Sequence, residues 1–201
     1  MKRLLSVCMV FAVLLLTCLA HADTLNLTGR PDSIAGGYYV GAAYGNLNGG
    51  PTTGFTCDDF STTTNIPSSF AVNVSTIPDL QYAKFKGQAN ALFKYEEAAW
   101  LLDQISANPT EVGNIQFAMW SLFDPATPYL GGGEQTWINA ANNINPSTLD
   151  FSGFRIYTAS SSVNQEFISG GVRSVPEPAT LLLLGFGLMG MLSIRRLRSK
   201  E

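Results

Sequence analysis

The chain has 201 residues, of which 12 are basic and 15 acidic, giving a formal net charge of −3. Its only histidine, His21, lies within the first 22 residues. The rest of the chain therefore has no imidazole for a Ser-His-Asp triad, a Cys-His dyad or a His-ligated zinc site, and these three kinds of site are excluded.

The N-terminal segment has the layout of a secretory signal peptide. Lys2 and Arg3 begin it, an apolar run occupies residues 4–19, and Ala-His-Ala follows at residues 20–22. A basic start, an apolar core and a small-x-small cleavage site are the three parts of such a signal. We therefore expect residues 1–22 to direct export and to be removed, so that the mature chain begins near Asp23.

The first half of the mature chain predicts β-strands. Short runs of β-branched, aromatic and alternating apolar residues are separated by glycines and by a Gly/Asn/Pro loop at 46–54. The expected strands lie at residues 25–27, 38–40, 42–44, 55–57 and 70–74.

The pattern then changes to helical spacing. In residues 94–107 apolar side chains recur every third or fourth position, which indicates an amphipathic helix. A second helix is predicted to begin at Asn108, a cap residue, and to run to about Phe123. Pro109 occupies its first helical position and Glu111 stands where a capping box places a glutamate.

The end of the body returns to strands. A weaker helix is expected over residues 134–144, and strands are expected at 156–157 and 163–168. The predicted fold class is α+β, a β-rich body (barrel or sandwich) over residues 23–168 with a helical insert. A linker is expected at 169–175.

The C-terminal segment combines a proline-flanked glutamate, an apolar stretch and a basic cluster. Pro176 and Pro178 keep the chain around Glu177 extended. The uncharged stretch 181–194 is short against the ~20 residues of a full span, but it lacks the polar face of a core helix. We expect it to be a transmembrane helix whose following arginines stay cytoplasmic, leaving the body outside. The basic cluster consists of Arg195, Arg196 and Arg198.

In motif, order and position, residues 176–200 resemble the PEP-CTERM sorting signal of Gram-negative bacteria. This resemblance implies that an exosortase, a membrane peptidase, recognises Pro176, Glu177 and Pro178. It implies an exported protein held in the inner membrane with its N-terminus outside, then processed and delivered to the cell surface or extracellular matrix. It also implies association with extracellular polysaccharide or biofilm.

Without its two ends, the body is acidic and holds one cysteine. It carries six basic and thirteen acidic residues, a net charge of −7. Phosphate binding needs clustered Lys and Arg, so nucleic acid and anionic lipid surfaces are not expected as partners. Cys57 can form no internal disulfide. It is a buried free thiol, an intermolecular partner or a reactive group.

Gln116 shares a predicted helix face with the apolar residues Ile115 and Met119. A buried amide without hydrogen-bond partners costs about 1–3 kcal/mol. Gln116 therefore either bonds to backbone where the helix meets the sheet, or it takes part in chemistry with another group.

A lone cysteine at the end of a strand, followed by a helical insert that ends in Ile-Gln-Phe-Ala-Met-Trp at 115–120, resembles the thioester domain of bacterial surface adhesins. The resemblance covers roughly residues 38–120. It implies that the Cys57 thiolate attacks the Gln116 carboxamide, releases ammonia and leaves a Cys–Gln thioester that acylates an amine or hydroxyl on a target surface. Two features depart from that family. Thr56 replaces the aromatic residue or leucine that usually precedes the cysteine, and members are mostly Gram-positive wall proteins.

Other residues offer weaker sites. Asp58 and Asp59 are expected to form a solvated turn rather than a calcium site, because no EF-hand spacing accompanies them. Trp100 and Trp120 are expected to pack in the core, which leaves Trp137 as the tryptophan most available to a glycan. No catalytic residue, metal or cofactor is predicted, and the chain is not expected to be an enzyme.

These features together predict a secreted surface or extracellular-matrix protein. Its expected role is adhesion, with covalent attachment through a thioester between Cys57 and Gln116. The alternative is a structural or glycan-binding biofilm matrix protein that has the same fold, forms no thioester and binds non-covalently.

Overall fold

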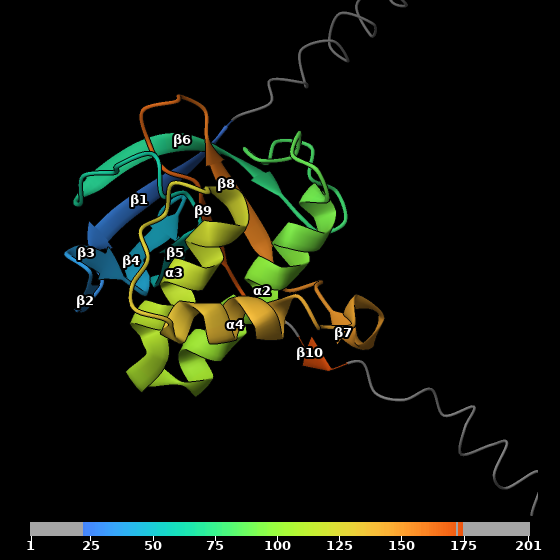
Figure 1. Cartoon of the computed structure of the whole chain (residues 1–201). Helices are drawn as coiled ribbons and strands as arrows, with labels where there is room; N and C mark the ends of the chain where they lie inside the picture. Colours follow the sequence, from blue (N-terminus) through green and yellow to red (C-terminus); the bar gives the residue numbers. More distant parts are fainter. Residues whose placement is uncertain (1–21, 172, 175–201) are drawn as a thin grey trace, which may run out of the picture.

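Six antiparallel strands close into a barrel (Figure 1). The structure is a computed structural model that describes residues 22–171 and 173–174. In their order around the barrel, the strands are β1 (Asp23–Gly29), β4 (Ala42–Leu47), β5 (Thr53–Cys57), β9 (Phe167–Ser169), β8 (Arg155–Ala159) and β6 (Ser68–Ser75). The predicted β-rich body is confirmed. Of the two architectures left open, the structure has the barrel, because β6 pairs with β1 on one side and with β8 on the other.

Alternating apolar side chains fill the barrel. Leu25 and Leu27 of β1 point inward and are almost fully buried, because successive side chains of a strand face opposite sides. They pack in one cluster with Phe55 of β5 and Phe167 of β9. Each such side chain stabilises the fold by about 1.5–3 kcal/mol through burial.

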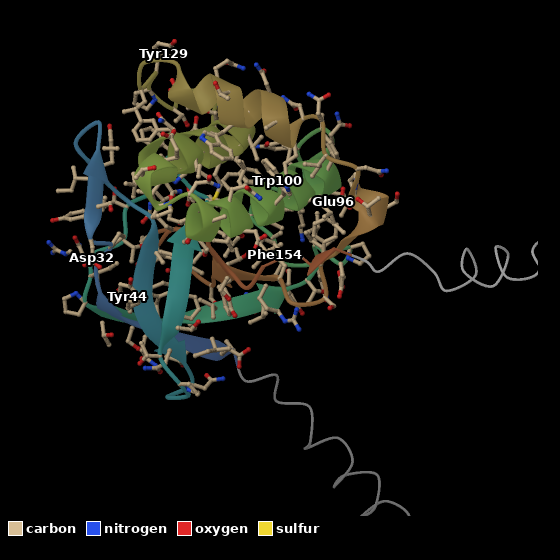
Figure 2. All side chains as sticks on the ribbon, turned by 90° about the horizontal axis from the view of Figure 1, so that it is seen from below. Asp32, Tyr44, Glu96, Trp100, Tyr129 and Phe154 are labelled. Atoms are coloured by element: carbon tan, nitrogen blue, oxygen red, sulfur yellow. The ribbon has the colours of Figure 1, made fainter. Side chains whose placement is uncertain are left out.

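Three helices inserted between β6 and β8 pack against one side of the barrel (Figure 1). They are α2 (Ala91–Ala107), α3 (Val112–Phe123) and α4 (Gly133–Ala141). Phe154, fully buried, lies between the helical layer and the strands (Figure 2). The helical insert and all three expected helices are thus confirmed, although α2 begins three residues before the predicted start.

A small hairpin between β1 and β4 packs against α3. It is formed by β2 (Ser33–Ala35) and β3 (Tyr38–Val40). Gly113 of α3 lies directly against it, since a Cβ at position 113 would be 2.7 Å from the Cβ of Ala35. This close approach fixes the hairpin, and the turn that follows it, relative to α3.

The structure differs from prediction at two local signals. No capping box forms before α3, because residues 109–111 make a 3₁₀ turn. Asn108 donates its side chain to Gln104 of the preceding helix instead, and Glu111 accepts from Asn114. The strand expected at 163–168 is also shorter. Its first four residues lie in a loop, and β9 begins only at Phe167.

The folded body reaches beyond Ile168. Ser169 ends β9, and β10 (Arg173–Ser174) pairs with β7 (Leu149–Asp150), just after a 3₁₀ turn at Pro146–Thr148. Within the part of the chain that the structure describes, no helix has the length and apolar character to cross a membrane. The predicted signal peptide, apart from its last residue, and the predicted transmembrane segment lie outside the described residues.

Candidate functional site

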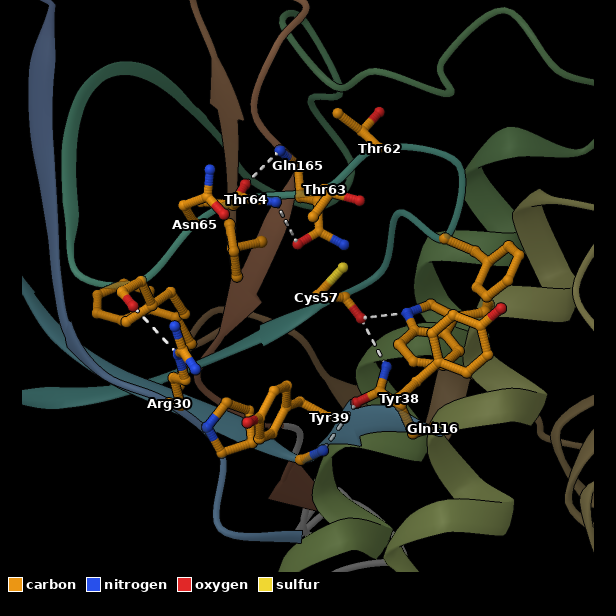
Figure 3. Close-up of a pocket in the computed structure, with 18 of the residues that line it drawn as sticks. Arg30, Tyr38, Tyr39, Cys57, Thr62, Thr63, Thr64, Asn65, Gln116 and Gln165 are labelled. Atoms are coloured by element: carbon orange, nitrogen blue, oxygen red, sulfur yellow. Dashed lines mark hydrogen bonds between the residues drawn. The ribbon is translucent and has the colours of Figure 1, made fainter. Parts of the chain in front are cut away.

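The barrel and the helices bring Cys57 and Gln116 together. Cys57 is the last residue of β5, and Gln116 lies in the first half of α3, 59 positions later. The Gln116 side-chain nitrogen donates to the Cys57 backbone carbonyl at 2.6 Å (Figure 3). The side chain is 1% exposed, so this contact satisfies an amide that would otherwise be costly to bury.

The other end of the Gln116 amide is also held by backbone. The Gly41 N–H donates to Gln116 Oε1 at 3.2 Å. Gly41 has a φ of +93°, a conformation that side-chain-bearing residues rarely adopt, and it forms the turn between β3 and β4. A glycine is therefore needed at this position to aim its N–H at the amide oxygen.

Trp120 lies one helical turn after Gln116 and shares its partner. Its indole Nε1 donates to the Cys57 carbonyl at 3.0 Å. The Cys57 carbonyl thus receives two donors from the same face of α3, and the end of β5 is tied to the helix. Trp120 is 4% exposed, as its predicted core position requires, but its N–H also positions the cysteine.

The Cys57 thiol points away from Gln116. Its sulfur accepts from the Asp59 N–H at 3.3 Å and donates to the Asp59 carbonyl at 3.0 Å. In Figure 3 the sulfur lies on the side of Cys57 that faces Thr64 and Gln165, while the Cys57 carbonyl faces Gln116. Cys57 and Gln116 nevertheless line one cavity of about 310 Å³.

The expected solvated turn at Asp58 and Asp59 is wrong, since both side chains are fully buried. Asp59 pairs with Lys84, whose Nζ lies 2.5 Å from Asp59 Oδ2. Burial, together with the charges of Glu166 and Asp59, raises the pKa of Asp58 well above its usual range. The raised pKa favours the neutral form of the Asp58 carboxyl group.

Glu166 joins these carboxyl groups from the loop before β9. Its carboxyl group accepts from the backbone N–H of Lys84 at 2.7 Å, from the Tyr95 hydroxyl at 2.5 Å and from the Thr158 hydroxyl. A buried carboxyl group with several donors is satisfied without being solvated. The Glu166 N–H also donates to Asp59 Oδ2 at 3.4 Å, so these two residues link the chain directly after Cys57 to α2 and β8. Asp58, Asp59 and Glu166 together form the buried acidic cluster.

The Cys57 thiol is held in its protonated form. Burial, followed by the nearby Asp58 and Asp59 carboxyl groups, raises its pKa well above the ordinary value. In a Gln116→Ala variant, where the thiol has no acyl partner, iodoacetamide should react with Cys57 more slowly at neutral pH than in the same protein unfolded in urea. Because only the thiolate reacts, the rate should rise with pH through a range above that of the unfolded thiol.

The pH profile of alkylation separates this effect from simple shielding. Restricted access would lower the rate by the same factor at every pH, whereas a raised pKa displaces the whole profile. Equal rates at neutral pH in the folded and unfolded protein would contradict the pKa assignment.

Sequence reasoning found two residues of this site and missed the groups that hold them. No sequence pattern indicated Gly41, Lys84 or Glu166, because each reaches the site through a contact with a residue that is distant in sequence. Trp120 was predicted only as a core residue, although its i, i+4 spacing places it on the same helix face as Gln116. Trp137, expected to be the tryptophan most available to a glycan, is partly buried and lies beside Trp100, which is also partly buried.

Comparisons with known proteins support two parts of this description. Residues 174–198 match the PEP-CTERM protein-sorting motif. The body is similar to two solved structures of the N-terminal thioester domain of a surface protein from Clostridium perfringens. The first, a cysteine-to-alanine variant, has a TM-score of 0.50 and 13% identity and covers 76% of this chain and 99% of that one. The unsubstituted domain has a TM-score of 0.50 and 12% identity over 75% of this chain and 99% of that one.

At such identities the similarity concerns the fold. No curated protein sequence matches the chain. The sorting motif marks an exported, surface-sorted protein, since this is what the motif directs. The chain therefore carries a PEP-CTERM sorting signal behind a body with the fold of bacterial thioester domains.

Proposed function

We propose that this protein is a surface or extracellular-matrix adhesin that attaches covalently through a thioester between Cys57 and Gln116. The observation that carries the proposal is the placement of the Gln116 amide. It is buried, held at both ends by the backbone of Gly41 and Cys57, and borders the cavity that the Cys57 side chain also lines. A reactive pair needs this proximity and exclusion of water more than it needs an imidazole.

Formation of the bond begins with a turn of the Cys57 side chain from Asp59 toward Gln116. The sulfur attacks the amide carbon, the carbon–nitrogen bond breaks, and the thiol proton leaves with the nitrogen as ammonia. The Gly41 N–H already lies at the amide oxygen, where negative charge develops during the attack. Its position allows it to stabilise the tetrahedral intermediate.

Attachment follows when a nucleophile of the target attacks the same carbon. The carbon–sulfur bond breaks, the nucleophile becomes acylated by the former glutamine side chain, and the sulfur takes up a proton. Each protein molecule reacts once and is consumed, so it acts as a reagent and not as an enzyme. Its exported location fits a role in which the target is outside the cell.

Processing at the C-terminus completes the proposal. The exported chain is held in the inner membrane by residues 181–194, and an exosortase recognises Pro176, Glu177 and Pro178 within the matched motif. The body then reaches the surface or the surrounding matrix, where biofilm polysaccharide is a candidate partner.

One observation favours a non-covalent alternative. Gln116 has hydrogen-bond partners at both ends of its amide, so its burial is also explained by a purely structural role. In that case the protein would be a structural or glycan-binding matrix protein with an unreactive Cys57.

The intact mass of the exported protein decides between the two. Condensation expels ammonia, so the protein should weigh about 17 Da less than the sequence between its own termini. Methylamine should add its own mass and release an alkylatable Cys57 thiol in the same step. A protein that shows its full mass and one alkylatable thiol, under handling free of amines, would exclude the thioester and leave the non-covalent reading.

A further inference from the structure

The cavity beside Cys57 and Gln116 is walled by aromatic rings and opens to solvent. Tyr38 and Tyr39 of β3 are 42% and 50% exposed and line it together with Phe60 and Trp120. The Tyr38 ring contacts the Phe60 ring edge-on, with centroids 5.2 Å apart. Such rings present flat apolar faces to a ligand while the tyrosine hydroxyls stay in water.

The opposite wall is polar and uncharged. It is the loop of residues 62–65, which Gln165 holds in place by accepting from the Thr64 N–H at 3.2 Å (Figure 3). Gln165 also donates to the Asp59 carbonyl at 2.9 Å. Thr63 and Asn65 are exposed there, and their side chains make no hydrogen bond to the described part of the chain. They are available to hydroxyl groups of a ligand.

Arg30 is the one permanently charged side chain among the described residues that line this cavity. Its Nε donates to the Ile66 carbonyl at 3.1 Å, and its guanidinium lies over the Tyr39 ring, 5.6 Å from the centroid. No carboxylate pairs with it, since within residues 22–171 and 173–174 the single ion pair joins Lys84 to Asp59. The terminal nitrogens of Arg30 therefore remain available to an anionic group of a ligand.

This arrangement discriminates between an amine and a hydroxyl, the two kinds of acceptor that a thioester can acylate. The body carries thirteen acidic and six basic residues, yet none of the acidic side chains lines the cavity in the described structure. A lysine ammonium would find no counter-ion there and would be repelled by Arg30. A hydroxyl next to an anionic group would be attracted by Arg30, which can bind a carboxylate through two parallel hydrogen bonds.

We propose that the acceptor is a hydroxyl of an acidic polysaccharide, whose carboxylate binds Arg30 while a sugar ring packs on Tyr39. The covalent step rests on the proposed thioester. The glycan hydroxyl oxygen attacks the Gln116 acyl carbon, the bond to the Cys57 sulfur breaks, and the hydroxyl proton ends on the sulfur. The products are a glutamyl ester of the glycan and a free Cys57 thiol.

Binding of the glycan can be measured without the thioester. In the full chain carrying Cys57→Ala, tetragalacturonate should bind in calorimetric titrations, and its fully methyl-esterified form should bind at least about tenfold more weakly because the charge is masked. Arg30→Gln should lower the affinity for tetragalacturonate by about tenfold. Tyr39→Ala should lower the affinity for both sugars, since it removes the stacking face.

Matched controls keep the result specific. Lys86→Gln removes the same charge from an exposed position outside the cavity and should leave the affinity unchanged. Three outcomes would overturn the proposal. Tetragalacturonate could fail to bind, or its methyl ester could bind equally well. A lysine peptide with an acetylated N-terminus and a free side-chain amine could also bind more tightly than either sugar.

The wild-type chain tests the covalent step separately. Incubation with tetragalacturonate should add the mass of the sugar in an ester that hydroxylamine cleaves, and Arg30→Gln should slow this addition without slowing the reaction with methylamine. If the mass deficit of about 17 Da is missing, the protein forms no thioester. The glycan site is then tested by the Cys57→Ala titrations alone. If the deficit is present and lysine peptides are acylated faster than the sugar, the acceptor assignment is wrong.

Discussion

Replacing Gln116 by glutamate is expected to abolish every methylamine-dependent mass change, because a carboxylate has no ammonia to expel. The same change should destabilise the fold. It replaces the N–H that donates to the Cys57 carbonyl at 2.6 Å with an oxygen, so that two acceptors face each other in a buried site. Loss of such a bond costs about 1–3 kcal/mol, which thermal melts would resolve.

Three variants measured together separate the chemical role of Gln116 from the structural one. Gln116→Ala should also remove all amine reactivity, while its melting temperature reports the loss of both amide bonds. Gln135→Glu makes the same chemical change on the exposed side of α4 and should alter neither property. A Gln116→Glu protein that melts like the wild type and keeps its amine reactivity would rule out both roles.

Lys84→Met is expected to have the largest effect on stability. Lys84 forms the one ion pair found among the described residues, with a fully buried Asp59. Removing one partner of a buried pair leaves an uncompensated charge and typically costs 3–5 kcal/mol. Because the Lys84 side chain is still 32% exposed, we expect a loss near the lower end, about 3 kcal/mol, in urea unfolding at neutral pH.

The cause can be checked by removing the other partner as well. Adding Asp59→Asn to Lys84→Met should recover much of the lost stability, since no buried charge then lacks a partner. Lys86→Met deletes a charge from an exposed side chain two positions later and should change stability little. If Lys84→Met unfolds at the same urea concentration as Lys86→Met, the buried acidic cluster does not depend on this lysine.

Local patterns predicted the elements well where packing followed periodicity. The α3 helix ends at Phe123 as expected, because its apolar face continues to that residue and Asp124 leaves the helical conformation. The loop at residues 163–166 was misread as strand, since Val163 is 71% exposed and belongs to no sheet of the described structure. A short segment with apolar residues at its ends cannot show whether a partner strand lies beside it.

Two conclusions about the chemistry of the site were available from the sequence. Cys57 is the only cysteine outside the predicted signal peptide, and Gln116 lies on an apolar helix face ahead of Trp120. These facts name a candidate pair because residue identity and helical spacing are both local. The sorting motif at the C-terminus was equally readable, since a peptidase recognises it as a linear sequence.

Only the tertiary structure decided how that pair is held and what it faces. Gly41 reaches Gln116 across 75 positions, Glu166 reaches Asp59 across 107, and the Arg30 guanidinium lies at the same cavity from the segment after β1. Asp58 and Asp59, polar by sequence, are buried because the barrel and α2 close over them with Lys84. Such contacts join residues distant along the chain and leave no periodic trace in it. The charge, burial and donors of the site therefore arise only when the barrel closes and the helices pack against it.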